Sequence, residues 1–111
     1  MSWGEAMNNI IITGKIVGEV REELNKELYC CKFKLKNMEY AYKKNNIETI
    51  YLDCICYGNV ARYVYHELYE DCDVLITGRM LTRHYVVNGS GFYKYYIGCN
   101  TVTKLEQEDY E

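Results

Sequence analysis

The residues best suited to chemistry in this sequence are its tyrosines, of which there are 13 against two phenylalanines and one tryptophan. A tyrosine ring offers a flat π-face while its hydroxyl stays hydrated, so tyrosine suits a half-exposed surface better than a dry core. Basic residues lie beside several of these rings, as in the segment from Tyr40 to Lys44. An outward tyrosine taken alone is more often a surface or cross-strand packing residue than a platform for a planar ligand, so the residue types by themselves leave both interpretations open.

Residues that could catalyse a reaction or hold a metal are present, but they are not arranged for either task. His66 falls on the polar face of an expected helix and His84 on an expected strand, and neither has carboxylate or cysteine neighbours at ligand spacing. Asp53 and Asp73 have no paired partner that suggests acid–base work. We therefore expect a binding protein with no catalytic residue, no metal site and no cofactor.

The six cysteines are expected to stay reduced, because none has the spacing of a zinc motif and no signal peptide opens the chain. Cys31, Cys54 and Cys56 fall on expected inward faces of strands, which suits small core residues. The longest apolar stretches are far shorter than the roughly 20 residues that cross a membrane. These observations predict a cytoplasmic protein without a membrane segment.

Length and charge predict one domain with a short tail. The chain has 111 residues and a formal net charge of −3, and a chain of this length supports one closed core. Four of the 16 acidic residues lie in the last six positions, which leaves 12 acidic against 13 basic residues in the rest. We expect an N-terminal extension over residues 1–7, a domain over 8–105 and a short acidic tail over 106–111.

Hydrophobic patterning predicts five strands and one helix. An apolar, β-branched run forms the first strand, a polar turn or loop follows, and the next segment alternates between apolar residues and lysines. A basic, aromatic hairpin loop then projects before the third strand, and a helix and a long hairpin complete the chain. The expected segments are strand 9–17, loop 19–27, strand 29–36, loop 38–48, strand 49–57, a helix from residue 58 towards 71, strand 74–87, turn 88–91 and strand 92–104.

Strand alternation assigns side chains to faces. In the second strand, Lys32, Lys34 and Lys36 share the outward face with Cys30. In the third strand, the outward residues are Tyr51, Asp53, Ile55 and Tyr57. In the helix, Val60, Val64 and Leu68 form the apolar stripe, with Ala61 and Tyr65 beside them.

The expected order is three strands, a helix and two further strands, and Gly14, Gly78 and Gly98 lie inside the strands. This order fits a small closed barrel that bends at its corners. The expected fold is all-β, a five-stranded oligonucleotide-binding (OB) barrel with one helix between strands three and four.

Three segments, in order, resemble the bacterial single-stranded DNA-binding protein family over about residues 8–105. Residues 8–16 are similar to its opening, an Asn followed by an apolar strand and Gly-basic-apolar. Residues 51–61 are similar to its aromatic-led strand, which ends in aromatic-Gly before an Ala-containing helix. The most specific match is residues 74–85, which are similar to its apolar-x-Gly-x-Leu-x-Thr-Arg-x-aromatic strand.

The resemblance implies sequence-tolerant binding and protection of single-stranded DNA in replication, recombination or repair. Tyr51, Tyr57 and Tyr85 occupy positions where the family keeps base-stacking aromatics, and Tyr40 or Tyr42 lies near a fourth. Stacking tolerates any base, and cations beside the rings hold the phosphates. The candidate phosphate-binding cations are Lys15, Lys32, Lys34, Lys36, Lys43, Lys44, Arg79, Arg83 and Lys94.

The resemblance also implies a homo-oligomer, a tetramer or otherwise a dimer. The sequence departs from the family in two ways: Asp53 is an acid on the expected DNA face, and the long Gly/Pro/Gln-rich tail with an apolar acidic tip is absent. We therefore expect few tail-mediated replication partners. The alternative function is that of a primosome-type OB adaptor protein, which acts mainly through protein–protein contacts.

Overall fold

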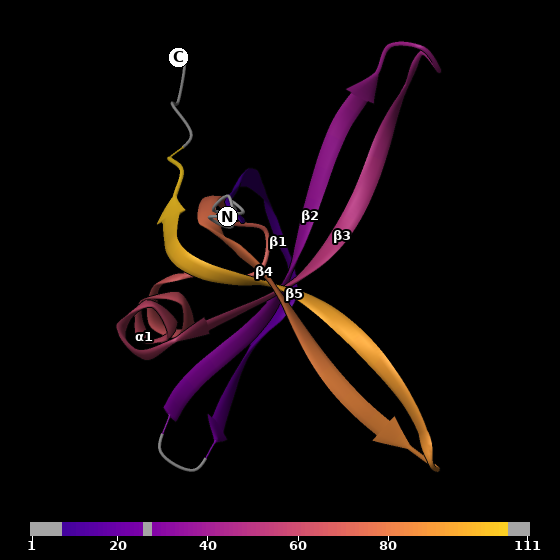
Figure 1. The fold of residues 1–111 in the computed structure, drawn as a ribbon. Coiled ribbons are helices and arrows are strands. Elements are labelled where there is room, and N and C mark those ends of the chain that lie inside the picture. Colours follow the sequence, from indigo (N-terminus) through magenta and orange to yellow (C-terminus); the bar gives the residue numbers. More distant parts are fainter. Residues whose placement is uncertain (1–7, 26–27, 107–111) are drawn as a thin grey trace, which may run out of the picture.

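The computed structural model describes residues 8–25 and 28–106, which form five strands and one helix (Figure 1). The strands pair in the order β1-β2-β3-β5-β4 and close into a barrel, which confirms the predicted five-stranded OB barrel with a helix between strands three and four. Neighbouring strands are antiparallel, except that β3 and β5 run parallel. The elements are β1 (Ile10–Asn25), β2 (Leu28–Ala41), β3 (Asn46–Tyr57), α1 (Gly58–Glu67), β4 (Asp73–Val87) and β5 (Ser90–Lys104).

The core fills the closed part of the barrel, where alternate residues of each strand point inward. Ile16, Leu35 and Ile76 are fully buried there, and each such side chain stabilises the fold by roughly 1.5–3 kcal/mol. All six cysteines are free thiols and are buried, so the inward orientation predicted for three of them is confirmed. The cysteines therefore serve as small apolar residues in a tightly filled interior.

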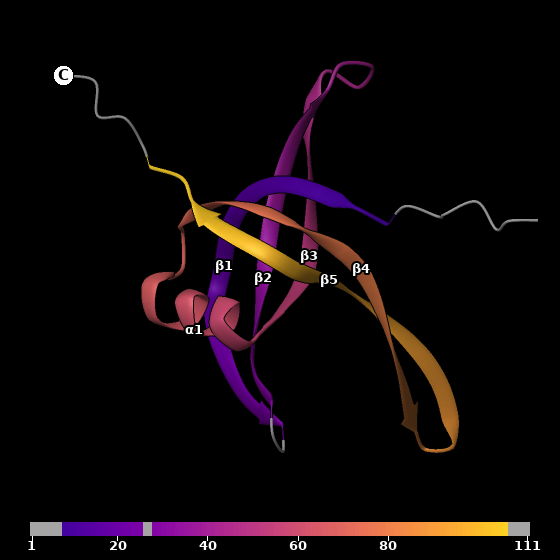
Figure 2. The same ribbon diagram turned by 60° about the vertical axis from the view of Figure 1, so that its left-hand side comes forward.

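Helix α1 packs mainly on β2 and covers one end of the barrel, as Figure 2 shows. The predicted start at Gly58 is confirmed, and the helix ends at Glu67, earlier than expected. Ala61, Val64 and Leu68 are buried. Tyr65 was expected beside this stripe, but it is exposed, because the barrel end accepts a narrow apolar face and leaves the flank of the helix in solvent.

Gly78 marks a corner of the barrel. A Cβ atom placed on Gly78 would lie 2.1 Å from the carbonyl oxygen of Gly98, so no other residue fits without moving the backbone. The register between β4 and β5 shifts between Thr77 and Gly78, which is the irregularity expected where a strand bends. The barrel-corner role predicted for this glycine thus has a direct steric cause.

The two loops predicted over 19–27 and 38–48 are wrong, because strands continue through most of both segments. β1 runs on to Asn25 past a bulge between Val17 and Arg21, and β2 and β3 extend to a turn over residues 42–45. Apart from Val20, which packs against the core, the extensions lack buried apolar side chains among their described residues, so the sequence lacks the apolar alternation that marks a strand. Ladder hydrogen bonds to the neighbouring strand supply the structure instead.

The extended strands form hairpins that radiate from the barrel, as Figure 1 shows. We name two of them: the β2–β3 arm, residues 37–50, and the β4–β5 arm, residues 80–97. The β4–β5 arm ends in the predicted turn, where Asn88 and Gly89 both have positive φ angles. The expected extension over residues 1–7 and most of the expected tail over 106–111 lie outside the described residues. In the part of the chain that the structure describes, no helix is long and apolar enough to cross a membrane.

Candidate nucleic-acid interface

The lysines and tyrosines predicted for the outward face of β2 and β3 do share one surface. In the β2–β3 ladder, Lys34 lies opposite Asp53 and Lys36 lies opposite Tyr51. Residues that face each other in an antiparallel pair project from the same side of the sheet. The alternation read from the sequence therefore places cations beside an aromatic ring on one continuous outer face.

A groove of about 660 Å³ crosses this face and extends onto β1 and β5. Three of the predicted phosphate-binding residues, Lys32, Lys34 and Lys94, line it. Four strands contribute to its walls, so its shape depends on closure of the barrel. The remaining lining residues are Val17, Gly18, Glu19, Arg21, Glu22, Glu23, Phe33, Asp53, Cys54 and Tyr96.

Tyr96, which was not among the predicted site residues, lies at the centre of these cations. The Lys32 and Lys94 ammonium groups lie 5.5 Å and 5.2 Å from the centroid of its ring, and the Arg83 guanidinium lies 5.9 Å away. The ring is nearly buried, at 4% exposure. Each such contact is attractive by about 0.5–2 kcal/mol, so the ring holds three positive charges together.

The position of Tyr96 could have been found from the hairpin register. A turn centred on Asn88 and Gly89 pairs Arg83 with Lys94, and Tyr96 follows Lys94 by two residues on the same face. The missing signal was therefore the pairing across the turn, not the residue type.

Arg83 connects the two strands that carry predicted stacking residues. Its guanidinium donates a hydrogen bond to the hydroxyl of Tyr57 on β3. On its own strand, the ring of Tyr85 stacks on that of Phe92 at 5.5 Å with an interplanar angle of 20°. The hydroxyls of Tyr85 and Tyr96 share a hydrogen bond of 3.1 Å. Tyr57 and Tyr85 are consequently half-buried and fixed by neighbours.

The remaining predicted stacking residues are more open. Tyr51 is 57% exposed, and Tyr40 and Tyr42 near the end of the β2–β3 arm are exposed as well. The outward face is not open along its whole length, however. Ile55 was expected to share the exposed face of Tyr51, and that expectation is wrong, because Ile55 is fully buried. Cys30, its neighbour on the lysine face of β2, is buried too.

Two carboxylates compete for the cations of the groove. The Glu23 carboxylate forms an ion pair with the Lys32 ammonium at 2.9 Å, and the Asp53 carboxylate lies 3.8 Å from the Lys94 ammonium. The hydrogen bond and charge of Lys32 lower the pKa of Glu23, and the same hydrogen bond raises the pKa of Lys32, so both are ionised at neutral pH. Glu23 was missed because its segment was predicted to be a loop. A phosphate that enters the groove has to replace these carboxylates.

Other predicted cations lie away from the groove. The Lys15 ammonium lies 3.4 Å from Asp73 and donates to the carbonyl of Asp71, at another end of the barrel. Lys44 is paired with Glu48 at 2.6 Å on the β2–β3 arm. Lys36 lines a second, smaller hollow with Lys15, while Lys43 and Arg79 are exposed outside both hollows. The structure therefore brings together four of the nine predicted cations: Lys32, Lys34, Arg83 and Lys94.

Among the described residues, no group of three or more His, Cys, Asp or Glu side chains is placed to hold a metal ion. The chemistry available in the groove is therefore that of aromatic rings, ammonium and guanidinium groups, and the carboxylates of Glu19, Glu22, Glu23 and Asp53. That set suits a flexible polyanion whose planar groups can stack.

Comparisons with known proteins agree with this chemistry. The crystal structure of a small single-stranded DNA-binding protein from Streptomyces coelicolor superimposes with a TM-score of 0.67, at 18% identity, covering 88% of this chain and 95% of that one. At this identity the likeness shows the shared fold. None of the curated protein sequences matches this chain. The profile of the single-strand binding protein family, whose members are non-enzymatic DNA-binding proteins, matches residues 7–105. The chain therefore belongs to the single-strand binding protein family.

Proposed function

We propose that this protein binds and protects single-stranded DNA with little sequence preference, and that the groove around Tyr96 is the binding site. The observation that carries the proposal is the gathering of Lys32, Arg83 and Lys94 around one ring. The outward face of β2 and β3 that carries Lys32 also carries the exposed ring of Tyr51. Cations at this density attract phosphates, and an exposed ring offers a platform to any base.

The strand would run from the β2–β3 arm across the groove towards the β4–β5 arm. Bases would stack on Tyr51 and, further out, on Tyr40, since both rings are exposed. Tyr57 and Tyr85 would contact bases at the edges of their fixed rings, while Lys34 and Lys94 would hold phosphates. Aromatic stacking contributes about 1–3 kcal/mol per base, so a few such contacts give useful affinity without reading a sequence.

We further propose that the protein acts in the cytoplasm as a homo-oligomer in DNA replication, recombination or repair, as the family membership supports. Repeated grooves in one assembly would let a single strand contact several copies, which raises its apparent affinity through a high effective concentration.

A titration with fluorescent oligonucleotides tests the proposal. Oligo-dT and a mixed-sequence strand should bind with similar affinity, duplex DNA should bind much more weakly, and rising salt should weaken binding. Light scattering in the same buffers gives the mass of the assembly. Binding that favours duplex DNA, or that does not change with salt, would contradict the proposal. A protein that binds single strands feebly but forms a stable complex with a second protein would instead support the adaptor function.

A further inference from the structure

The β4–β5 arm lies in a part of the chain that has no acidic residue. Between Val74 and Leu105 there are four basic residues and no acid, although the whole chain has a net charge of −3. Three of these cations, Arg79, Arg83 and Lys94, lie at or near the arm. A screening length of about 8 Å at physiological salt lets charges on a thin two-stranded ribbon act on both of its faces. Both faces of the arm therefore favour an anion.

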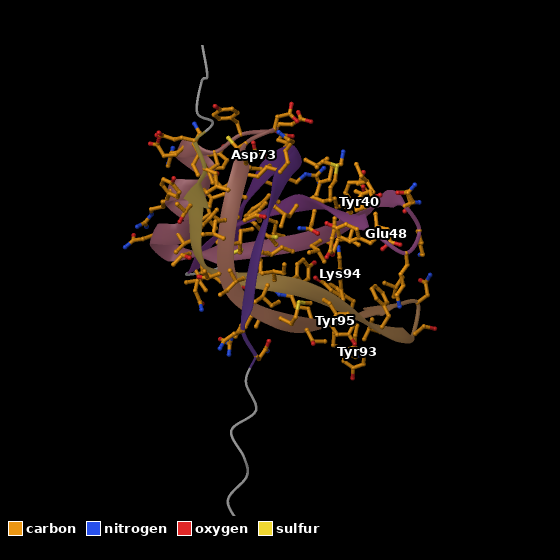
Figure 3. All side chains as sticks on the ribbon, turned by 90° about the horizontal axis from the view of Figure 1, so that it is seen from above. Tyr40, Glu48, Asp73, Tyr93, Lys94 and Tyr95 are labelled. Atoms are coloured by element: carbon orange, nitrogen blue, oxygen red, sulfur yellow. The ribbon has the colours of Figure 1, made fainter. Side chains whose placement is uncertain are left out.

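The face of the arm that points away from the groove carries two exposed tyrosines. Tyr93 is 65% exposed and Tyr95 is 61% exposed. Figure 3 shows Lys94 on the side of the arm that faces the β2–β3 arm, and Tyr93 and Tyr95 on the other side. We call this side, with Thr82, His84, Tyr93 and Tyr95, the far face. Thr82 pairs with Tyr95 and His84 with Tyr93, so the four side chains share one surface.

The spacing of the two tyrosine rings matches the space that one stacked base needs between them. Residues two apart in a strand lie about 6.8 Å from each other. That distance is about twice the 3.4 Å that separates neighbouring nucleotides along a stacked strand. Tyr93 is also supported from one side, since the ring of His84 lies 4.9 Å from it at a tilt of 41°. A ring that is already positioned loses less conformational freedom when a base stacks on it.

We propose that single-stranded nucleic acid continues from the groove around the β4–β5 arm and stacks bases on Tyr93 and Tyr95 of the far face. This second contact surface rests on the proposed function of the groove. Continuity supports it, because Lys94 lines the groove and lies between the two tyrosines in the chain, so a strand held by Lys94 reaches either ring by passing around the two-stranded ribbon. A strand long enough to round the arm would contact both faces at once.

The length of the strand distinguishes the two surfaces. A strand of about 8 nucleotides falls within the ~4–16 nucleotides that one OB fold binds, and it fills the groove first. A strand of about 30 nucleotides exceeds that range and reaches the far face. Replacing both far-face tyrosines, Y93A/Y95A, should weaken binding of the long strand by at least about 30-fold, the equivalent of two stacks at about 1 kcal/mol each. Binding of the short strand should stay within about twofold of the original value.

Helix α1 offers a matched control. Tyr63 and Tyr65 are also exposed, but Glu67, Glu70 and Asp71 follow them closely in the chain. The Y63A/Y65A variant removes the same number of rings from a surface where these three acids outnumber Arg62, and it should bind both strands as the original protein does. Circular dichroism and light scattering on each variant report fold and assembly mass.

The outcomes separate this inference from the proposed function. If the original protein binds neither strand, the proposed function itself fails. If it binds both and Y93A/Y95A binds the long strand unchanged, the far face makes no contact and the inference is overturned. It is also overturned if Y93A/Y95A loses the short strand equally, or if its assembly falls apart, since the far face would then belong to the groove or to a contact between copies.

Photocrosslinking gives a test that needs no variant. A long strand that carries 5-iododeoxyuridine at successive positions is irradiated on the original protein, and the crosslinked residues are identified by mass spectrometry. Crosslinks at Tyr93 or Tyr95 with the long strand, and their absence with the short one, support the inference. Crosslinks that are confined to Tyr51 and to groove residues such as Tyr96 at every position would overturn it.

Discussion

The β2–β3 arm and the β4–β5 arm project from one side of the barrel (Figure 3). They carry similar residue types, but the tyrosines and lysines have different neighbours on the two arms. On the β2–β3 arm, the rings of Tyr40 and Tyr42 contact each other edge to face at 4.8 Å, and Lys44 is bound by Glu48 of the same arm. On the β4–β5 arm, Arg83 and Lys94 lie over the ring of Tyr96, and the arm has no acid of its own.

This difference shows that a tyrosine next to a lysine in the sequence does not define a binding site. A lysine that is paired with a carboxylate at 2.6 Å has much of its field cancelled. A cation over a ring keeps its net charge, because the ring is neutral, and it is held in place as well. The β4–β5 arm therefore offers ordered charge, in which Lys94 has the Asp53 carboxylate of β3 at 3.8 Å, whereas the β2–β3 arm offers mainly aromatic surface.

The largest effect is expected for Arg83→Ala. The change removes a phosphate-binding cation, frees the Tyr57 hydroxyl and takes one of three charges from Tyr96, so the groove loses charge and order together. We expect DNA affinity to fall by about 2–3 kcal/mol, measured by titration of fluorescent oligo-dT. Arg79→Ala is the matched control on the same strand, outside the groove, and it should cost less than about 1 kcal/mol. Equal losses for the two variants would mean that net charge alone, not the arrangement around Tyr96, drives binding.

Tyr51 should give the next largest effect, and it distinguishes stacking from hydrogen bonding. Tyr51→Ala should cost about 1–2 kcal/mol of DNA affinity without loss of stability, because the ring is exposed. Tyr51→Phe should be nearly neutral, since no hydrogen bond of the Tyr51 hydroxyl is found among the described residues. Tyr57→Phe should cost more than Tyr51→Phe, because it removes the partner of Arg83. If both phenylalanine variants bind like the original protein, the Arg83–Tyr57 contact has no part in binding.

The closed part of the barrel could be predicted from the sequence, because one face of each strand is buried there. Burial imposes the alternation that placed Cys31, Cys54 and Cys56 inward, and the steric conflict at Gly78 demands a glycine that the sequence displays. The β4–β5 arm was also predicted as two strands, because its turn residues mark a hairpin between them. The β2–β3 arm and the end of β1 could not be predicted as strands, because most of their side chains are exposed and follow no apolar period. Their structure depends on pairing with the neighbouring strand, and the sequence of a single segment does not show with which strand it pairs.

The site could be predicted in part for the same reason. Tyr51, Lys32 and Lys34 follow from alternation within a single strand. The gathering around Tyr96 depends on contacts between β2, β4 and β5, which lie far apart in the sequence. Ile55 shows the opposite failure, since a residue on the outward face of its own strand is buried by parts of the molecule that the strand pattern does not contain.

Salt dependence sharpens the comparison of the arms further. Each phosphate that a cation neutralises contributes about −0.7 to the slope of log affinity against log salt for a single strand. Lys94→Ala should make that slope shallower by about 0.7, because Lys94 lines the groove. Lys44→Ala should leave the slope nearly unchanged, since Glu48 already neutralises this lysine. Titrations at four or more salt concentrations measure both slopes, and a larger change for Lys44 would place the phosphate path on the β2–β3 arm.

The smallest effect is expected for Asp53→Asn, and its sign is the informative quantity. Asp53 lies in the groove 3.8 Å from Lys94, so its carboxylate repels an incoming phosphate and occupies a cation that the phosphate needs. The asparagine keeps the size of the side chain and removes the charge, and it should raise DNA affinity about two- to fivefold, equivalent to about 0.4–1 kcal/mol.

Glu48→Gln is the counterpart on the β2–β3 arm, because it also releases a lysine, Lys44, from a carboxylate. Both variants change the net charge of the chain by the same amount, so any difference between them reports position. If phosphates follow the groove, Asp53→Asn strengthens binding more than Glu48→Gln does. Equal gains would show that the strand responds to overall charge, and a gain confined to Glu48→Gln would move the binding path to the end of the β2–β3 arm, where Tyr40 and Tyr42 would then be the main stacking platform.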